Sequence, residues 1–413
     1  MSAFNTAFAP AFRSAWASIW GLGSTLASAV RALFSQGQQG AWYDLSDMST
    51  LYQDAAGATP VTTIEQPVGL MRDKSGRNNH ASQATAASRP VLSARVNLLT
   101  SSEDFASASW NKLASATITG TKQINLAAVA NSRVESSGIA STVGAVWTAG
   151  LTVSGTGSLL LAIVDLGGSF PVTSTSVNLT ATPTRYTVTR THTDAAATNV
   201  LFRITNVANA AATVIVDAPQ FETGTTATRY QRVNTATDYD SIGFPMYGKS
   251  DGVDDSMSSA TGGGGTAGFF FCQAIKSTGG AGAVRTLLSD SGTNSGYRVQ
   301  LNASNQLSFS AGNGTAYTTI ATAAATVVGT THLLTAWDDG TNLNVQLDSG
   351  TVATIARPVV TAGTAGFTLG KDNGAATGFF NGNLYPEVYR QGGGLTAAER
   401  AQVQAYVRSK AGI

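Results

Sequence analysis

The sequence predicts a mainly β protein in which an N-terminal α-helix precedes β-sandwich units. Three observations lead to this prediction. Residues 3–35 carry apolar side chains at helical spacing, whereas later apolar residues fall in short runs or alternate with polar ones. Turn-forming residues, among them many of the 44 glycines, separate these runs at fairly regular intervals. A hydrophobic share of 43% is enough to build cores of ordinary size.

The charge balance and the reactive residues exclude several classes of function. Lysine and arginine number 25 against 24 acidic residues, so the net charge is +1 and a nucleic acid is not an expected partner. Only 12% of residues are charged, compared with about 25% in ordinary soluble domains. One cysteine, Cys272, and three histidines argue against a disulfide framework and a zinc site. Cys272 lies in an apolar run and is expected to be a buried, inert thiol.

The N-terminal segment, residues 1–38, is predicted to attach the chain to other proteins. An aromatic residue recurs at every fourth position, which places all of them on one face of a helix: Phe4, Phe8, Phe12, Trp16 and Trp20. So wide an aromatic face is not stable in water on a lone helix. We therefore expect it to be buried against sister chains or a larger assembly.

Two other interpretations of this segment remain open. Arg13, the apolar residues after it and the small residues at 27–29 also fit a secretory signal, although the basic start is a single arginine. A membrane span is the weaker alternative, because several serines dilute the stretch between Arg13 and Arg31, which is shorter than the about 20 apolar residues that a bilayer requires. No membrane span is expected.

A first group of strands is predicted between residues 97 and 232. Residues 185–190 alternate polar and apolar side chains, as a half-buried antiparallel strand does, and residues 159–164 are continuously apolar, as in a strand buried on both faces. The expected strands are 117–121, 146–154, 158–164, 185–190, 200–205 and 213–217.

A second group of strands is predicted after residue 238, followed by one helix. The expected strands are 268–272, 297–301, 306–310, 331–337, 343–347, 366–369 and 382–388. Turn signals at 338–340 and 348–350 indicate hairpins. In the last segment Thr396 and Glu399 have the spacing of a capping box and Gly412 can end the helix. Its buried stripe is expected to consist of Val403, Tyr406 and Val407.

Several of these segments resemble laminin-G-like or concanavalin-like sandwich domains. The closing strand and helix of that family are matched by residues 382–389 (GNLYPEVY) and 395–400 (LTAAER), and its early strand and turn by 249–255 (KSDGVDD). Residues 42–47 (WYDLSD) and 73–76 (DKSG), with His80, Gln83 and Arg89, are similar to a segment that usually comes directly before that turn. Because a long stretch intervenes here, we predict a sandwich interrupted by an inserted unit.

The inserted unit has a resemblance of its own, to carbohydrate-binding-module-like jelly rolls. It begins with residues 97–99 (NLL), 102–105 (SEDF) and Trp110, and it ends with 220–224 (QFETG) and 227–230 (ATRY). We predict four segments: 1–38, the helical attachment segment; 39–96, the first part of the laminin-G-like sandwich; 97–232, the inserted jelly roll; and 233–413, the remainder of the sandwich with its C-terminal helix.

This arrangement is similar to that of bacteriophage tail-fibre and adsorption proteins. The resemblance implies a virion location at the tail or particle surface, a homo-oligomer that is usually a trimer, contacts with other virion proteins through the N-terminal helix, and a host-surface glycan as ligand. A surface with almost no net charge favours uncharged glycans. The alternatives are a purely structural virion protein, such as a capsid decoration or collar component, and a polysaccharide-degrading tailspike.

Candidate site residues come from loops at the ends of strands, where sandwiches present their ligand sites. The carbohydrate-binding candidates are Asn294, Asp338, Asp339, Asn342, Asp372 and Asn373. Asp251, Asp254 and Asp255 are weak candidates for oxygen ligands of Ca²⁺, and no other cofactor is expected. The glutamates are far apart in sequence and lack the close spacing of glycosidase carboxylates, so no catalytic residues are assigned and the protein is not expected to be an enzyme.

Overall fold

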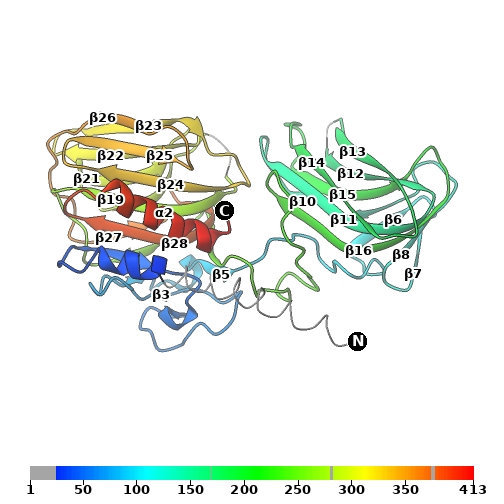
Figure 1. Ribbon diagram of the computed structural model, residues 1–413, viewed down its shortest axis with the longest axis horizontal. Helices are drawn as coiled ribbons and strands as arrows, with labels where there is room; N and C mark the ends of the chain where they lie inside the picture. Colours follow the sequence, from blue (N-terminus) through cyan, green and yellow to red (C-terminus); the bar gives the residue numbers. More distant parts are fainter. Residues whose placement is uncertain (1–24, 168, 280–281, 374–376) are drawn as a thin grey trace, which may run out of the picture.

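A computed structural model describes residues 25–413, except 168, 280–281 and 374–376. The chain is mainly β, as predicted, and forms two bodies that lie side by side (Figure 1). One body combines strands from before residue 94 with strands from after residue 246, and the other contains the strands between them. The predicted aromatic row from Phe4 to Trp20 lies outside the described residues.

The first sheet of the larger body combines strands from both ends of the chain. Its order is β26-β25-β24-β19-β28-β17-β5, and β1 also pairs with β28. Its strands in the described part of the chain are β1 (Gly40–Tyr43), β5 (Val91–Ser93), β17 (Tyr247–Asp251), β19 (Phe269–Ser277), β24 (Thr331–Asp338), β25 (Asn342–Leu347), β26 (Ala353–Ala356) and β28 (Asn381–Gln391).

The second sheet packs on the first and has the order β2-β3-β4-β18-β27-β20-β21-β22-β23. Its strands are β2 (Leu51–Tyr52), β3 (Leu70–Met71), β4 (Ala81–Ser82), β18 (Met257–Ser259), β20 (Arg285–Ser289), β21 (Ser295–Leu301), β22 (Gln306–Asn313), β23 (Tyr317–Ala325) and β27 (Phe367–Leu369). Two short 3-10 helices, η1 (Met48–Thr50) and η2 (Ala86–Ser88), interrupt the early loops. The core between the sheets contains Phe269, Phe271, Tyr297, Phe309 and Tyr389, all fully buried. We call this body the split sandwich.

The smaller body, the inserted sandwich, has two sheets of its own. One has the order β13-β12-β15-β9-β6, with β10 on β15, and the other has the order β14-β11-β16-β8-β7. The strands are β6 (Trp110–Leu113), β7 (Thr117–Thr119), β8 (Gln123–Leu126), β9 (Arg133–Ser136), β10 (Ile139–Ala140), β11 (Val146–Thr156), β12 (Ser158–Leu166), β13 (Val172–Asn178), β14 (Thr184–Thr191), β15 (Asn199–Asn206) and β16 (Ala212–Thr223). Trp110 and Trp147 are buried among Phe202 and Phe221 in its core.

Two buried amides hold the crossing points between the bodies. Asn97 donates from Nδ2 to the carbonyls of Pro219 and Gln231, and its Oδ1 accepts the backbone N–H of Phe221. Gln231 accepts the backbone N–H groups of Val96 and Asn97 on its Oε1. Because both side chains are fully buried and hydrogen-bonded, the segment that enters the inserted sandwich and the segment that leaves it are tied together.

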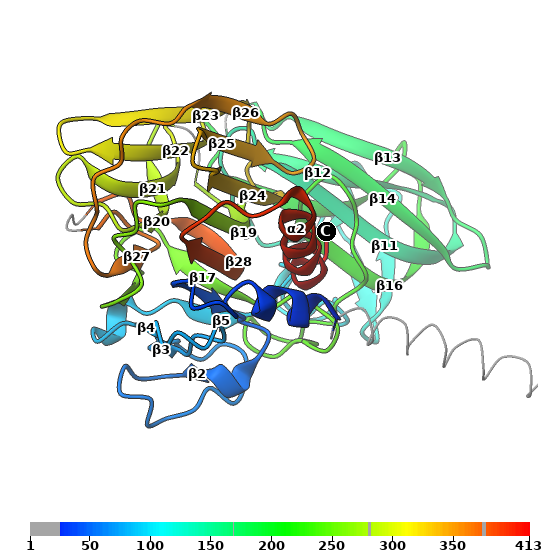
Figure 2. The ribbon, with the colours of Figure 1, turned by 60° about the vertical axis from the view of Figure 1, so that its left-hand side comes forward.

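Two helices cover part of the outer face of the first sheet (Figure 2). One is α2 (Ala397–Ala411), whose capping box between Thr396 and Glu399, buried stripe and left-handed Gly412 are all as predicted. The other covers residues 25–32 and is followed by a turn. No helix of the described residues is long and apolar enough to cross a membrane.

The second helix is anchored to the sandwich at its C-terminal end. Val30, Leu33 and Phe34 are buried in one cluster with side chains of the sheet and of α2. Arg390 Nε donates to the carbonyl of Leu33 (3.0 Å), and Arg77 Nη2 donates to that of Phe34 (2.7 Å). Arginine side chains at this end satisfy carbonyls that have no partner within the helix. The last part of the predicted attachment segment therefore packs on the split sandwich.

Candidate functional site

Of the six predicted carbohydrate-binding residues, three lie in or beside the hairpin between β24 and β25. Asp338 is fully buried: its carboxylate accepts the hydroxyl of Tyr297 (2.7 Å) and pairs with Arg357 Nε (2.7 Å). Asp339 is exposed and accepts the backbone N–H groups of residues 341 and 342, so it shapes the turn that contains Asn342. The hydrogen bonds of Asp338 hold the fold together and leave its carboxylate no contact with solvent.

The other three candidates lie around the hairpin between β20 and β21. Asp372 accepts hydroxyl groups of Ser289 and Ser291, and Asn373 donates to the carbonyl of Ser291. Asn294 donates from its amide to the carbonyl of Thr315 (2.6 Å). The structure thus brings Asp372 and Asn373 together on one serine-rich loop. Whether these loops bind a glycan stays a prediction.

The three metal-ligand candidates do come together in space. One carboxylate oxygen of each of Asp251, Asp254 and Asp255 lies within 4.8 Å of the others. Burial, together with the two neighbouring carboxylates, raises the pKa of Asp255 to about 6. Several of these oxygens already accept protein hydrogen bonds, from the backbone of Asp251 and from Ser88 among others. Ca²⁺ takes six to eight oxygen ligands, and the cluster brings together one oxygen from each of three carboxylates, so it supplies only part of that coordination shell.

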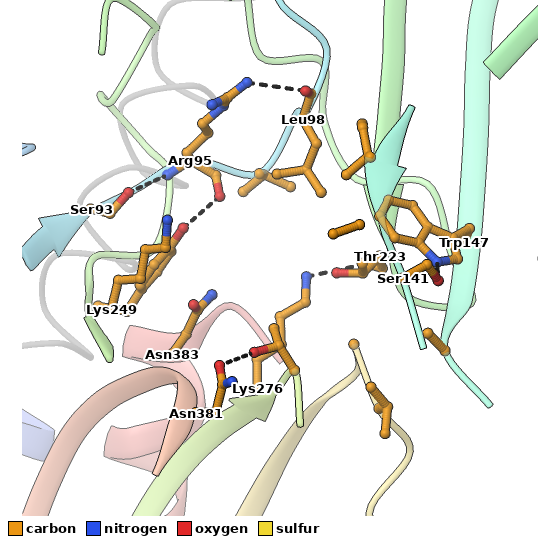
Figure 3. A pocket seen from close by; sticks show the side chains of 18 of the residues that line it. Ser93, Arg95, Leu98, Ser141, Trp147, Thr223, Lys249, Lys276, Asn381 and Asn383 are labelled. Carbon is orange, nitrogen blue, oxygen red and sulfur yellow. Dashed lines mark hydrogen bonds between the residues drawn. The ribbon is translucent and has the colours of Figure 1, made fainter. Parts of the chain in front are cut away.

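A cavity of about 490 Å³ lies between the two bodies, and none of the nine candidates lines it (Figure 3). Its floor is one end of the outer face of the first sheet. The opposite wall is formed by the end of the inserted sandwich that carries Ile139, Ser141 and Trp147, and the sides are linker residues and a loop at 328–329. The size falls within the range of about 300–1,000 Å³ that is usual for small-molecule sites.

Three adjacent strands of the floor place polar side chains in one row. In the sheet register Lys249 of β17 pairs with Asn383 of β28, and Asn383 pairs with Lys276 of β19. Paired residues of neighbouring strands point to the same face of a sheet. Because strands are about 4.8 Å apart, the two lysine backbones are about 10 Å apart. The row therefore presents an amide flanked by two ammonium groups to the cavity.

Lys276 connects the two bodies and reaches into the cavity from β19 (Figure 3). Its ammonium donates to the backbone carbonyl of Thr223, at the end of β16 in the inserted sandwich, over 3.2 Å. Burial lowers the pKa of Lys276 to about 8, and the attraction of Glu222 opposes this shift. Glu222 itself accepts hydrogen bonds from Gln220 and Thr228.

A second contact between the bodies lies next to Lys276. Val328, in the loop between β23 and β24, is buried in the core of the inserted sandwich. Its neighbour Gly329 has a φ of +78°, and a Cβ atom there would lie 2.8 Å from Cβ of Thr223. Glycine is therefore required both by the backbone conformation and by the close approach. These contacts determine the width of the cavity at this point.

This cavity was not predicted from the sequence, because the residues of its walls are spread from 65 to 383 and come from both bodies. One signal was available. Lys276 is the only charged residue in a strand that is otherwise apolar or weakly polar, FFFCQAIKS, and a charge in such a strand has to reach water, a counter-ion or a ligand. The three candidates of the β24–β25 hairpin lie at the other end of the first sheet, because β24 begins beside the cavity at Thr331 and ends at Asp338, about 23 Å further along.

Comparisons with known proteins place the chain in no family. No protein family and no curated protein matches the sequence. Among solved structures, the CBM40 module of the Ruminococcus gnavus IT-sialidase bound to α2,3-sialyllactose is 14% identical, with a TM-score of 0.29; the match covers 33% of this chain and 80% of that one. A structure concerned with the cell entry of botulinum neurotoxin type C, which depends on interaction with two ganglioside molecules, is 13% identical with a TM-score of 0.31; the match covers 41% of this chain and 43% of that one.

A further similar structure is the receptor-binding domain of botulinum neurotoxin type G, at 11% identity and a TM-score of 0.28, with 40% of this chain and 43% of that chain covered. Similarity at these scores carries no argument about what this chain binds.

Proposed function

We propose that the chain is a non-catalytic carbohydrate-binding protein and that the cavity between its two bodies holds the saccharide. The observation that carries this proposal is the composition of the cavity walls. The floor offers amide, hydroxyl and ammonium groups from Asn381, Asn383, Thr278 and Lys276. The side and the opposite wall offer apolar surface, including Ile139.

This combination suits a sugar ring. Its hydroxyl groups both donate and accept hydrogen bonds, and an amide side chain can do the same in return. Its C–H groups are apolar and can pack on the partly exposed side chain of Ile139. Few precisely placed polar groups on a largely apolar wall are the usual composition of a ligand site.

The carboxylates around the cavity support binding rather than hydrolysis. Glycosidases generally use two carboxyl groups that flank the scissile bond about 5–10 Å apart. Among the described residues that line the cavity, Glu65 is the one carboxylate. Its Oε1 accepts the hydroxyl groups of Ser93 and Tyr239, so it is engaged in the structure of the linker region. A second carboxylate at suitable distance would be needed for catalysis at this site.

In the proposed biological setting the chain is a fibre or spike on a tailed bacteriophage particle. The resemblance to phage adsorption proteins and the aromatic row of residues 4–20 support this setting. Sister chains, usually three in such fibres, would join through that row and attach to other virion proteins. Single saccharide sites of roughly 10⁻³–10⁻⁴ M would then gain affinity for a host cell through repetition on one particle.

The saccharide site can be tested with a glycan array that carries bacterial capsular and lipopolysaccharide glycans. Ala140 is exposed and lines the cavity, so Ala140→Trp is expected to fill it and weaken binding at least about tenfold. The matched control is Ala323→Trp, at an exposed alanine of β23 outside the cavity, which should bind normally. If Asp339→Ala or Asn373→Ala abolishes binding and Ala140→Trp does not, the strand-end loops are the site and the cavity is not.

Two further outcomes decide between classes of function. Release of oligosaccharide from a bound glycan would overturn the non-catalytic proposal in favour of a polysaccharide-degrading tailspike. Failure of the full chain to bind any glycan on the array would favour a structural virion component.

The attachment proposal needs a separate deletion that respects the packing of residues 30–34. Removal of residues 1–24 leaves the buried side chains of Val30, Leu33 and Phe34 in place. We expect this deletion to reduce the oligomer to monomers in light scattering without lowering the melting temperature of the sandwiches. An unchanged oligomer would contradict the role given to the aromatic row.

A further inference from the structure

The cavity has an excess of positive charge although the whole chain is almost neutral. Its lining includes three basic residues, Arg95, Lys249 and Lys276, and one acidic residue, Glu65. In the described part of the chain, none of the three basic groups forms an ion pair with a carboxylate. The chain thus has a net charge of only +1, although basic groups are concentrated at this site.

No carboxylate of the described residues pairs directly with these cations, although Glu222 attracts Lys276 and Glu65 attracts Arg95 from a greater distance. Arg95 donates to the backbone carbonyls of Asn97, Leu98 and Leu99, which are neutral acceptors. Lys276 makes one bond, also to a carbonyl, although an ammonium group has three N–H donors. Burying a charge without a counter-ion is costly, and such groups in cavities often await a ligand of opposite charge.

The row of Lys249, Asn383 and Lys276 determines what kind of anion fits. The two ammonium groups start from backbones about 10 Å apart, with the amide between them. Lysine side chains are flexible and can converge on one anion between them, and the amide of Asn383 can bond a neighbouring hydroxyl. A negatively charged group attached to a hydroxyl-bearing ring meets all three side chains at once.

We infer that the cavity binds an acidic saccharide, with the sugar carboxylate between Lys276 and Lys249 and a ring hydroxyl on Asn383. This inference rests on the proposed function, because it specifies the charge of the saccharide in the same cavity. It departs from the expectation that an almost neutral protein favours uncharged glycans, because the field inside a cleft depends on the charges that line it and not on their sum over the chain.

The inference can be tested with two pairs of sugars that differ in charge. Trigalacturonic acid is compared with its methyl ester, and sialyllactose with lactose, by calorimetric titration of the full chain at pH 7. We expect both acids to bind at least about tenfold more tightly than their neutral partners, because bonds between charged groups are about twice as strong as neutral ones. Binding of the acids should also weaken when the salt concentration is raised to 0.5 M.

The site is assigned with lysine variants. Lys276→Gln and Lys249→Gln are each expected to weaken binding of the preferred acid about tenfold. The matched control is Lys122→Gln, which removes the same charge from a surface ion pair with Asp217 in the inserted sandwich, and it should leave binding unchanged. Because Lys249 is exposed, its variant folds normally even if Lys276→Gln alters the contact between the bodies.

The outcomes separate this inference from the proposed function. If the ester or lactose binds as tightly as its acid, or if the lysine variants bind as the wild type does, the inference is wrong while glycan binding stands. If none of the four sugars binds, the inference is also wrong, and the glycan array alone then decides the proposed function.

Discussion

The two ends of the outer face of the first sheet differ in what covers them. At one end α2 and residues 30–34 cover Trp42, Phe270 and Val388, which are fully buried. At the other end no helix formed by the described residues covers the sheet, and the row of Lys249, Asn383 and Lys276 faces the cavity instead. The strands are the same, because β19 and β28 run the full length of this face.

Within a single strand, the outward-facing side chains change from apolar to polar at the point where the covering helices end. Along the outer side of β19 the side chains are Phe270, Cys272 and Ala274, all buried in the sealed cluster, and then Lys276. Along β24 they end similarly, with Leu333 buried and Thr331 partly exposed. The same sheet face is thus part of the core where helices cover it. It is a candidate binding site where it faces the inserted sandwich across the cavity.

The largest expected effect on stability comes from a substitution at the end of this sheet face that the helices cover. Phe34 is 1% exposed, and Phe34→Ala is expected to lower the free energy of unfolding of the split sandwich by about 3–5 kcal/mol, because it leaves a cavity under the helix of residues 25–32. Chemical denaturation measures the change. The matched control is Phe170→Ala, at a phenylalanine that is 57% exposed, for which a change within about 0.5 kcal/mol is expected. Equal losses in the two variants would mean that the helix does not seal the sheet.

A smaller effect on stability is expected when a buried polar contact at the helix-covered end is removed. The hydroxyl of Tyr406 accepts the indole N–H of Trp42 (3.1 Å) and donates to Asp44 Oδ2 (2.8 Å). Tyr406→Phe leaves the indole N–H unpaired in a buried place, so we expect a loss of about 1–3 kcal/mol in the free energy of unfolding.

The control for this variant is a tyrosine that water can reach. Tyr317 is partly exposed and donates to the backbone carbonyls of Gly292 and Ser295, so Tyr317→Phe should cost less than about 1 kcal/mol because water can replace its hydroxyl. A smaller loss in Tyr406→Phe than in Tyr317→Phe, measured by the same denaturation, would show that α2 is not fixed by this contact.

The regular parts of the fold could be predicted because their signals are local. The alternation in residues 185–190 corresponds to β14, and the capping box at Thr396 lies at the start of α2. The strand β23 was missed because its sequence, YTTIATAAA, is rich in alanine, which is not typical of strands, and it lies at the edge of its sheet with little side chain to bury. The predicted burial of Cys272 is confirmed, and burial raises the pKa of its thiol to about 12.

The candidate site was harder to predict because its partners are distant in sequence. Asp338 was selected as a polar residue at a hairpin, but its partners Tyr297 and Arg357 come from other strands and loops and bury it. The cavity lies where the two bodies meet, and no periodic pattern in the sequence encodes how they pack against each other. The position of Lys276 in an apolar strand indicates that the residue has a special environment. It does not indicate which part of the protein lies opposite.

The smallest effect is expected at the open end, and it has the opposite sign. A lysine retained for binding costs stability where burial disfavours its charge, and replacing a poorly compensated buried charge with an apolar side chain is often stabilising. Lys276→Met keeps an unbranched side chain that is one atom shorter, and it should raise the free energy of unfolding by about 1 kcal/mol at pH 7. Lys249→Met, at an exposed lysine of the same row, should change it by less than about 0.5 kcal/mol.

The pH dependence of stability tests the cause of this gain. The charged groups around Lys276 are Glu222 on β16, Lys249 on β17, and Arg95 and Glu65 beside the linker. Burial lowers the pKa of Lys276 to about 8, whereas in the unfolded chain it is about 10.4. The folded state then binds fewer protons between these values, so stability is highest above the unfolded pKa and is lost as the pH falls to about 8. Wild-type protein should therefore gain stability relative to Lys276→Met as the pH rises from 7 to 10, and parallel curves for the two proteins would contradict a desolvated ammonium at the open end of the sheet.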